Sequence, residues 1–415
     1  MNPAGRVASL DLIRGVAVLG ILVLNIGGFA GPTGATLSPH VPAPGSLADE
    51  IAFAVGMVLF EGKMRALFTL LFGASMLLFI ERGEAAGRDG DILQFRRLAW
   101  LLLFGILHFF LLWWGDILFS FALVGIFALL MRELSVKALV ASALLIFAGW
   151  HLGCAAMSLP EVQTEERVRL GTATPVERAA VADYRARIAA SAQTEMAEYR
   201  SGFLENVAIK LDKRLFWLIQ TTVPNVGETL PLMLIGMALY RTGFFSGGWR
   251  RKRMRQMAIA GTAGGLALTL AALAWLWPRD FPPQAMSAAM LYWLAIPHLL
   301  MALGYAALLT LATPRLLRTA PGARLAAAGR MAFSNYIGTT ILMTAIFYGW
   351  GLGLIGSYGR FAQLGFVALA WALMLAWSQP WLAHFRQGPL EWLWRSLTEK
   401  RLMPFRRNDI ATYSH

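Results

Sequence analysis

Two titratable residues, His108 and Asp116, are the strongest candidates for chemistry in this sequence of 415 residues. His108 lies in the apolar run 97–114, close to the end at which Gly115 and Asp116 turn the chain. A histidine held neutral in such a position suits general-base catalysis, and a nearby carboxylate can orient it or stabilise its charged form. A structural role, in which His108 bonds to another helix, fits the sequence equally well. The spacing does not establish whether the turn brings Asp116 back toward His108, so the two residues are a candidate catalytic pair.

A primary amide, Asn25, lies near the outer end of the first apolar run, 12–30. Such an amide can donate a hydrogen bond to a carbonyl oxygen as negative charge develops on it, which would give Asn25 a catalytic role. It can also bond to a neighbouring helix, the more common use of an amide in a membrane. The run opens with Asp11 and Arg14, which are three residues apart and can pair on one helix face.

Four further polar residues are predicted to bind substrate, namely Lys63, Arg65, Glu228 and Asn335. Lys63 and Arg65 lie on the outer side, where short segments otherwise avoid basic residues. They can bind an acidic group, or simply neutralise the acid beside them. Pro224 is expected to break the preceding amphipathic helix, so that Glu228 opens the next run and lines a cavity from outside. Asn335 opens a later run at its cytoplasmic end.

The composition excludes an ordinary soluble enzyme. Hydrophobic residues make up 57% of the chain and charged residues 15%, against about 45–50% and about 25% in soluble domains. Cys154 is the only cysteine, which excludes an internal disulfide framework and a cysteine-based zinc cluster. The six histidines form no cluster in the sequence, and no metal-ligand spacing, nucleophile elbow or Walker loop is present, so we expect no metal.

The apolar runs predict an all-α, polytopic membrane helix bundle with about ten transmembrane helices and both termini in the cytoplasm. A hydrocarbon core of about 30 Å needs about 20 apolar residues per helix. Runs of roughly this length lie at 12–30, 64–80, 97–114, 116–131, 136–157, 226–241, 256–277, 287–312, 331–349 and 361–383. Lys and Arg gather in loops of one parity, as on the cytoplasmic side of membrane proteins. The net charge of +13 therefore indicates orientation and not binding to nucleic acid.

One polar insertion, 158–216, interrupts the runs and is expected outside the cytoplasm. Thr174-Pro175-Val176-Glu177 has the pattern of a helix start, with Thr174 as the cap and Glu177 reaching back to it. A helix is predicted from there to about Phe203, as a cap over the outer face, and the segment 47–60 is predicted to be a helix on the same surface. The chain thus divides into a transmembrane half (1–157), the insertion, a second transmembrane half (217–400) and a cytoplasmic tail (401–415).

Several motifs resemble those of the YeiB-like family, bacterial inner-membrane proteins whose later half carries a domain of unknown function. They are Arg6…Leu10-Asp11-x-x-Arg14-Gly15…Asn25, Glu61-Gly62-Lys63, His108…Gly115-Asp116-Ile117-Leu118, Gly329-Arg330…Asn335-Tyr336 and Gly388-Pro389-Leu390-Glu391-Trp392. The resemblance covers nearly the whole chain apart from 158–216. That family is grouped in a transmembrane acyltransferase superfamily with the lysosomal heparan-alpha-glucosaminide N-acetyltransferase.

The resemblance implies a multi-pass protein of the bacterial inner membrane that moves an acyl group across it. The donor would be acetyl-CoA or another acyl-CoA in the cytoplasm, and the acceptor a sugar-type or envelope molecule outside. Asn25 matches an active-site asparagine at the end of the first helix of the lysosomal enzyme. The histidine that follows in that enzyme has no match, because His40 comes too far on, so His108 would act as the base and Asn25 would steady the oxyanion. The phosphates of CoA would bind to a basic rim, comprising Arg250, Arg251, Lys252, Arg253 and Arg330.

Two other functions remain open from the sequence. One is a transporter or flippase for an acidic or lipid-linked molecule, in which Asp116, Glu228 and His108 couple transport to protons. The other is a membrane scaffold without catalysis. The expected partners are the lipid bilayer and the small-molecule donor and acceptor, and the sequence leaves open a homodimer, the acyl chain length and the identity of the acceptor.

Overall fold

The computed structural model describes residues 7–407, and within them the regular structure is helical. The elements in chain order are α1 (Ala8–Ala30), η1 (Thr33–Thr36), α2 (Leu47–Leu59), α3 (Lys63–Ala85), α4 (Gly90–Leu111), α5 (Leu118–Leu130), α6 (Val136–Arg169), α7 (Pro175–Tyr199), α8 (Phe203–Lys213), α9 (Trp217–Arg241), α10 (Arg251–Leu276), η2 (Trp277–Arg279), α11 (Pro283–Ala288), η3 (Ala289–Trp293), α12 (Ala295–Leu316), α13 (Ala320–Arg330), α14 (Ala332–Phe347), α15 (Arg360–His384) and α16 (Pro389–Glu399).

Seven helical segments in the described part of the chain are long and apolar enough to cross a membrane. They are Ala8–Ala30, Leu47–Ala85, Gly90–Leu111, Val136–Arg169, Arg251–Arg279, Ala295–Leu316 and Arg360–His384. Two shorter apolar helices, α5 and α14, lie among them. The predicted all-helical architecture is therefore confirmed for the described residues, with seven candidate membrane-spanning helices.

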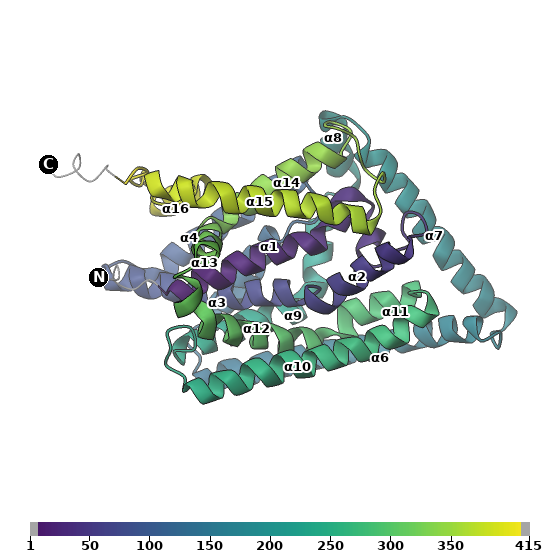
Figure 1. The fold of residues 1–415 in the computed structure, drawn as a ribbon, viewed down its shortest axis with the longest axis horizontal. Helices are drawn as coiled ribbons and strands as arrows, with labels where there is room; N and C mark the ends of the chain where they lie inside the picture. The colour runs from purple at the N-terminus through teal and green to yellow at the C-terminus, as the bar shows by residue number, and fades with distance from the viewer. Residues whose placement is uncertain (1–6, 408–415) are drawn as a thin grey trace.

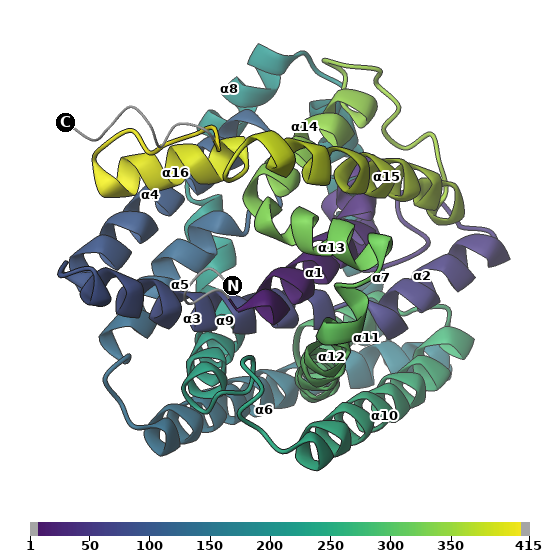
Figure 2. The same ribbon diagram turned by 60° about the vertical axis from the view of Figure 1, so that its left-hand side comes forward.

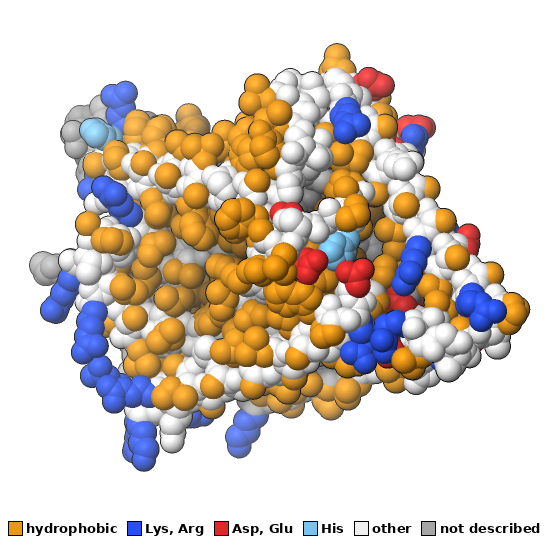
Figure 3. Space-filling view, turned by 45° about the vertical axis from the view of Figure 1, so that its right-hand side comes forward, with side chains coloured by type: hydrophobic (Ala, Val, Ile, Leu, Met, Phe, Trp, Pro, Cys, Tyr) orange, Lys and Arg blue, Asp and Glu red, His pale blue; other side chains and the backbone are white. Residues whose placement is uncertain are grey.

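Helix α1 is the central helix of the bundle. Its most apolar window is 72% buried inside the protein, whereas those of α6, α10 and α15 are only 22–28% buried. Figures 1 and 2 show α1 running through the middle of the molecule, and it packs against α3, α12, α13, α14 and α15. The outer helices instead expose large apolar side chains such as Leu145 and Ile259, as expected of a surface that faces lipid. Figure 3 shows this apolar surface between an edge rich in Lys and Arg and an opposite end of mixed charge.

Two glycines allow the backbones of α1 and α13 to touch. A Cβ atom added to Gly15 would lie 2.0 Å from the carbonyl oxygen of Leu325, and one added to Gly329 would lie 1.9 Å from that of Asp11. Both positions therefore require glycine, as at other close helix crossings in membranes. This contact sets the start of α1 beside the end of α13, with Arg14 next to Gly15 and Arg330 next to Gly329.

The insertion begins inside a continuous helix. Helix α6 runs on to Arg169, so the predicted boundary at 157/158 falls within it. The predicted helix start is confirmed, because α7 opens with a capping box between Thr174 and Glu177 and with Pro175 in its first turn. The helix ends at Tyr199, a few residues before the predicted end, and Figure 1 shows it crossing one end of the molecule. The helix predicted at 47–60 is also present, as α2.

The predicted helix break at Pro224 is wrong. Helix α9 continues from Trp217 to Arg241 with Pro224 inside it, so Glu228 does not open a new helix. A proline is tolerated within a membrane helix where other groups satisfy the freed backbone. Pro224 removes the N–H that would bond to the carbonyl oxygen of Gln220. At the next carbonyl, that of Thr221, the side-chain amide of Asn225 donates a hydrogen bond at 2.7 Å.

Candidate active site

The structure brings His108 and Asp116 together, and it adds a third residue, Thr340. Nδ1 of His108 lies 2.8 Å from a carboxylate oxygen of Asp116, and Nε2 lies 3.1 Å from the hydroxyl oxygen of Thr340 on α14. His108 is 2% exposed and the Asp116 side chain is fully buried. The Thr340 hydroxyl also lies 3.1 Å from the carbonyl oxygen of Tyr336, so its one hydrogen can be donated either to that oxygen or to Nε2. When it is donated to Nε2, the carboxylate, imidazole and hydroxyl form the arrangement in which an oriented base can take a proton from a hydroxyl group.

Local sequence explains how the turn after α4 returns Asp116 to His108. The second carboxylate oxygen of Asp116 accepts a hydrogen bond from the backbone N–H of Phe119 at 2.8 Å, so Asp116 also caps the start of α5. A Cβ atom on Gly105, one turn before His108, would lie 2.3 Å from the nitrogen of Phe119. Only glycine at position 105 allows α5 to approach α4 so closely, and this approach places the carboxylate beside the imidazole.

Asn25 lies in a small cavity that Thr340 also lines. Its other lining residues are Val18, Ile21, Leu22, Phe29, Tyr336 and Thr339. The Asn25 side chain makes no hydrogen bond to the described residues, so both its N–H groups are available to a ligand. His108 does not line this small cavity. Thr340 lines it and contacts the imidazole, so Thr340 connects the cavity that holds Asn25 with His108.

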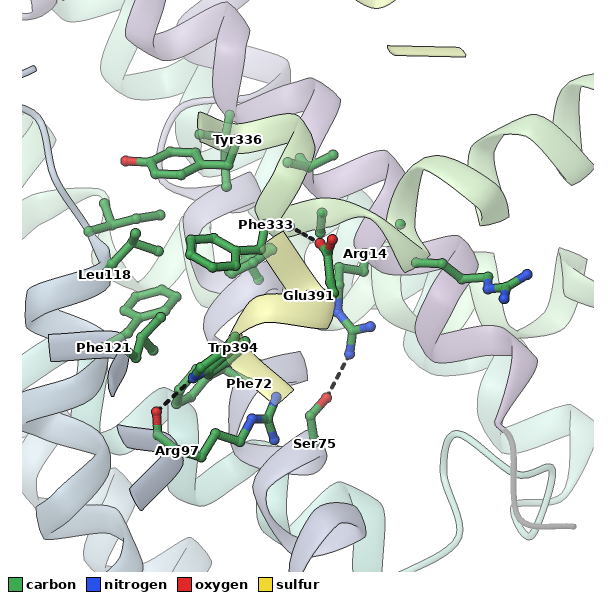
Figure 4. Close-up of a pocket in the computed structure, with 18 residues that line it drawn as sticks. Arg14, Phe72, Ser75, Arg97, Leu118, Phe121, Phe333, Tyr336, Glu391 and Trp394 are labelled. Carbon is green, nitrogen blue, oxygen red and sulfur yellow. Dashed lines mark hydrogen bonds between the residues drawn. The ribbon is translucent and has the colours of Figure 1, made fainter. Parts of the chain in front are cut away.

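A larger cavity adjoins the small one on the side toward the start of α1 and occupies about 830 Å³, its solvent-open mouth included. Val18, Ile21 and Tyr336 line both cavities and form the wall between them. The middle of the larger cavity is aromatic, with Phe72, Phe121, Phe333 and Trp394 among its lining residues (Figure 4). An apolar chain could therefore lie in it.

Three arginines line this larger cavity, Arg14, Arg97 and Arg330. Arg14 donates to the hydroxyl of Ser75 at 2.7 Å, as Figure 4 shows, and lies 3.5 Å from Asp11. The guanidinium of Arg97 stacks on the rings of Phe79 and Trp394. Guanidinium groups in such a position bind phosphate well.

Of the predicted basic rim, the structure places only Arg330 at the cavity. Arg250, Arg251, Lys252 and Arg253 are exposed side chains around the start of α10, and none of them lines the cavities described above. A run of Lys and Arg beside an apolar helix is common in membrane proteins without a ligand. Sequence reasoning missed Arg97 as a ligand-binding candidate because it treated this residue only as a mark of orientation.

Glu391 also lines this cavity, and it holds the start of α14, the helix that carries Thr340. Its carboxylate accepts hydrogen bonds from the backbone N–H groups of Phe333 (2.7 Å) and Ser334 (3.0 Å) and from the Ser334 hydroxyl (2.5 Å). Burial raises the pKa of this carboxyl group, and the hydrogen bonds from Ser334 and Phe333 oppose that shift. A Cβ atom on Gly388 would lie 2.1 Å from the carboxylate, so glycine is needed at this position. The Gly-Pro-Leu-Glu-Trp motif thus supplies both the Glu391 carboxylate and the space that it occupies.

A third pocket, of about 870 Å³ including its open side, lies just beyond the other end of α1. Ala30 and Gly31 line it, together with the segment 38–46 and the residues that lead into α15. Arg360 at the start of α15 lies between this pocket and Gly27, where an added Cβ atom would meet its guanidinium at 1.9 Å. Sequence reasoning did not select Arg360, although the Gly27-Gly28 pair directly after Asn25 could have indicated a close contact at this point.

The residues predicted to bind substrate lie apart from these cavities. Arg65 pairs with Glu228 at 2.7 Å, so the structure joins two of the four residues to each other. Lys63 is fully buried and its ammonium donates to the carbonyl oxygen of Met57 at 2.7 Å. Asn335 is 2% exposed and bonds to Ala328, Ser378 and Trp377. These contacts join helices, and none of the four residues lines a cavity described here.

Comparison with known proteins gives relatives along nearly the whole chain. The chain is 32% identical over 403 residues to the uncharacterized protein YeiB of Escherichia coli K12, with 96% of this chain and 98% of that protein covered. The chain belongs to the YeiB-like family. It is also 27% identical to the uncharacterized protein YxaH of Bacillus subtilis 168, with 95% of this chain and 94% of that protein covered. Residues 239–401 match the family described as a protein of unknown function, DUF418. No solved structure matches the chain significantly.

The DUF418 match covers only part of the candidate active site. Residues 239–401 include Thr340 and Glu391, whereas Asn25, His108 and Asp116 lie before them. The site is therefore assembled from both halves of the chain, and the relatives cover both halves.

Proposed function

We propose that this protein is a membrane acyltransferase that passes an acyl group from a cytoplasmic acyl-CoA to an acceptor on the opposite side of the membrane. One observation carries the proposal. Three cavities follow one another along α1, with the His108–Thr340 pair beside the middle one. Arg14 lines the first, Asn25 the second and Ala30 the third. At about 1.5 Å per residue, these positions span most of the thickness of a hydrocarbon core.

The donor would occupy the larger cavity. Arg14, Arg97 and Arg330 at its cytoplasmic side would bind the phosphates of CoA. The pantetheine arm would run past Phe72 and Phe121, whose rings pack against each other on the cavity wall, with the thioester near Tyr336. No metal takes part in this scheme, because the base and the oxyanion donor are both side chains.

The acyl transfer would use Thr340 to carry the proton. The acceptor hydroxyl or amine attacks the thioester carbonyl and gives its proton to the Thr340 oxygen, while the Thr340 hydrogen moves to Nε2 of His108. Asp116 stabilises the imidazolium that forms. The side-chain amide of Asn25 donates to the oxyanion, an interaction commonly worth about 2.7–4 kcal/mol. Collapse of the intermediate then releases the CoA thiolate, which takes the proton back from His108.

The acceptor would enter through the third pocket, which lies at the Ala30 end of α1 and is called the outer pocket from here on. Phe29 lines the small cavity and stacks on Trp113 with ring centroids 4.0 Å apart, and the indole of Trp113 donates to the carbonyl oxygen of Gly28. These two rings would have to part for an acceptor to reach Asn25. A hydroxyl-rich acceptor suits the polar and backbone groups of the outer pocket.

The proposal includes ten membrane crossings, both termini in the cytoplasm and a location in the bacterial inner membrane. The seven long apolar helices would be joined by α5, α9 and α14. The starts of α1 and of α16 lie toward the same end of the bundle in Figure 1, which supports an even number of crossings.

Isothermal titration of the purified protein with acetyl-CoA tests the donor site. We expect binding, and we expect Arg14→Gln to weaken it at least about tenfold, because a charge-assisted hydrogen bond contributes about 1.5–3 kcal/mol. Arg251→Gln is the matched control, since Arg251 belongs to the exposed rim, and it should bind as the unaltered protein does. Absence of binding, or equal weakening in both variants, would contradict the proposed donor site.

A transporter or flippase is the alternative, and one feature favours it, the partly buried ion pair between Arg65 and Glu228. Such a pair inside a membrane protein can couple transport to ion or proton movement. The pair does not line the cavities that follow α1, however, so the charged groups do not form one path. Release of free CoA thiol from acetyl-CoA would support transfer, whereas uptake into proteoliposomes without thiol release would support transport.

A further inference from the structure

A second cluster of ionisable residues lies beyond the outer end of α1, away from the candidate active site. His40 comes from the segment between α1 and α2, Glu50 from the first turn of α2, and Asp280 from the turn between η2 and α11. Nε2 of His40 lies 3.1 Å from a carboxylate oxygen of Asp280 and 3.8 Å from one of Glu50. One ligand atom from each residue lies within 4.8 Å of the other two.

We propose that His40, Glu50 and Asp280 bind a zinc ion. Zinc takes imidazole nitrogen at about 2.0–2.1 Å and carboxylate oxygen at about 2.0–2.2 Å, so two ligands of one tetrahedral ion lie roughly 3.3 Å apart. The distance from Nε2 of His40 to Asp280, 3.1 Å, is slightly shorter than that value, and the distance to Glu50, 3.8 Å, is slightly longer. Nε2 of His40 is buried and makes no hydrogen bond in the described structure, although two carboxylates face it. Three protein ligands with a solvent-accessible fourth position are typical of non-structural zinc sites.

The surroundings hold the two carboxylates in place. The second oxygen of Glu50 accepts a hydrogen bond from the indole of Trp277 at 2.7 Å, which leaves the first oxygen directed at His40. Such outer hydrogen bonds orient metal ligands. Asp280 has a left-handed backbone (φ 60°) and an 87% exposed side chain, so solvent reaches the site from its side.

One contact must change when zinc binds. The backbone N–H of Gly45 donates to Nδ1 of His40 at 3.2 Å. Coordination through Nε2 places the ring proton on Nδ1, so this hydrogen bond must open. Gly45 lies in the proline-rich segment 41–45, which also lines the outer pocket. Zinc would therefore join three segments of the chain and reposition one wall of that pocket.

Metal titration of the full-length protein tests this site, independently of any acyltransferase activity. The protein is purified without a histidine tag, treated with EDTA and titrated with zinc chloride, and the bound metal is counted by mass spectrometry. We expect one zinc ion per chain. Asp280→Asn should weaken binding at least about tenfold, since even outer-shell changes cost about 10–100-fold. Asparagine tolerates the left-handed backbone, and the side chain is exposed, so this variant should fold.

Two further variants complete the test. His40→Gln should abolish binding, whereas His384→Gln, which alters an exposed histidine at the far end of α15, should leave it unchanged. Less than one zinc per chain in the unaltered protein would overturn the proposal and leave His40 as an ion-pair partner of the two carboxylates. Equal zinc affinity in Asp280→Asn and the unaltered protein would overturn it as well.

Discussion

The contact between Glu391 and the start of α14 leads to a sharp prediction about stability. In Glu391→Ala the backbone N–H groups of Phe333 and Ser334 lose their acceptor, and both residues are less than 10% exposed. Each buried donor left without a partner costs about 1–3 kcal/mol. We therefore expect Glu391→Ala to reduce the free energy of unfolding by about 2–6 kcal/mol.

Glu391→Gln separates the hydrogen bonds from the charge. A glutamine oxygen can still accept from both N–H groups, and the loss of the charge removes the burial penalty that raises the pKa of the Glu391 carboxyl group. The free energy of unfolding of this variant should lie within about 1 kcal/mol of that of the unaltered protein, an effect nearly as small as that of a surface substitution.

Thermal unfolding of the purified proteins at one heating rate, followed by tryptophan fluorescence, measures the difference. Glu391→Ala should melt roughly 5–10 °C lower, and Glu391→Gln should melt near the unaltered protein. Glu133→Ala is the control, because it removes only a largely exposed ion pair with Arg132. A glutamine variant as unstable as the alanine variant would show that the charge itself holds α14 and would refute this reasoning.

Three other predictions concern separate parts of the molecule. His108→Ala should leave the protein folded and able to bind acetyl-CoA but slow the release of CoA thiol at least about 100-fold; loss of expression would instead indicate a structural histidine. Gly27→Ala should lower the melting temperature, because its Cβ would meet the guanidinium of Arg360 at 1.9 Å, and overpacking costs about 1–3 kcal/mol; Gly264→Ala, with open space around it, is the control. Burial lowers the pKa of Lys210 to about 7, so the folded protein releases this proton before the unfolded chain does. Stability should therefore rise between about pH 7 and 10, by up to about 1.4 kcal/mol per pH unit, and Lys210→Met should reduce that rise in pH-dependent melting curves.

Lys210 also connects the insertion with the candidate active site. Its ammonium donates to the carbonyl oxygens of Phe109 (3.1 Å) and Leu112 (3.2 Å), which end the helix that carries His108. Helix ends leave such carbonyls without partners, and a cation there is favourable. The insertion, predicted as a cap over the outer face, thus holds α4 directly after the imidazole.

Local signals predicted the helices well, and they failed where a proline or a change of composition did not end the helix. Thr174 and Glu177 predicted the start of α7 because a capping box lies within four residues. Pro224 suggested a break, but α9 continues through it from Trp217 to Arg241. The domain boundary at 157/158 was predicted from a change from apolar to polar composition. Such a change does not end a helix, and the backbone hydrogen bonds of α6 continue to Arg169.

The sequence by itself determined that this is a helical membrane protein, because hydrophobic runs and Lys/Arg in short loops depend on the bilayer and not on which helices touch. It also selected His108 and Asp116, since polar groups are costly within lipid. Only the tertiary structure decided their partners. Thr340 lies 232 positions from His108, and Asp280 lies far along the chain from His40. Glycines at the helix crossings bring such residues together, and a glycine in a sequence does not show which helix will approach it.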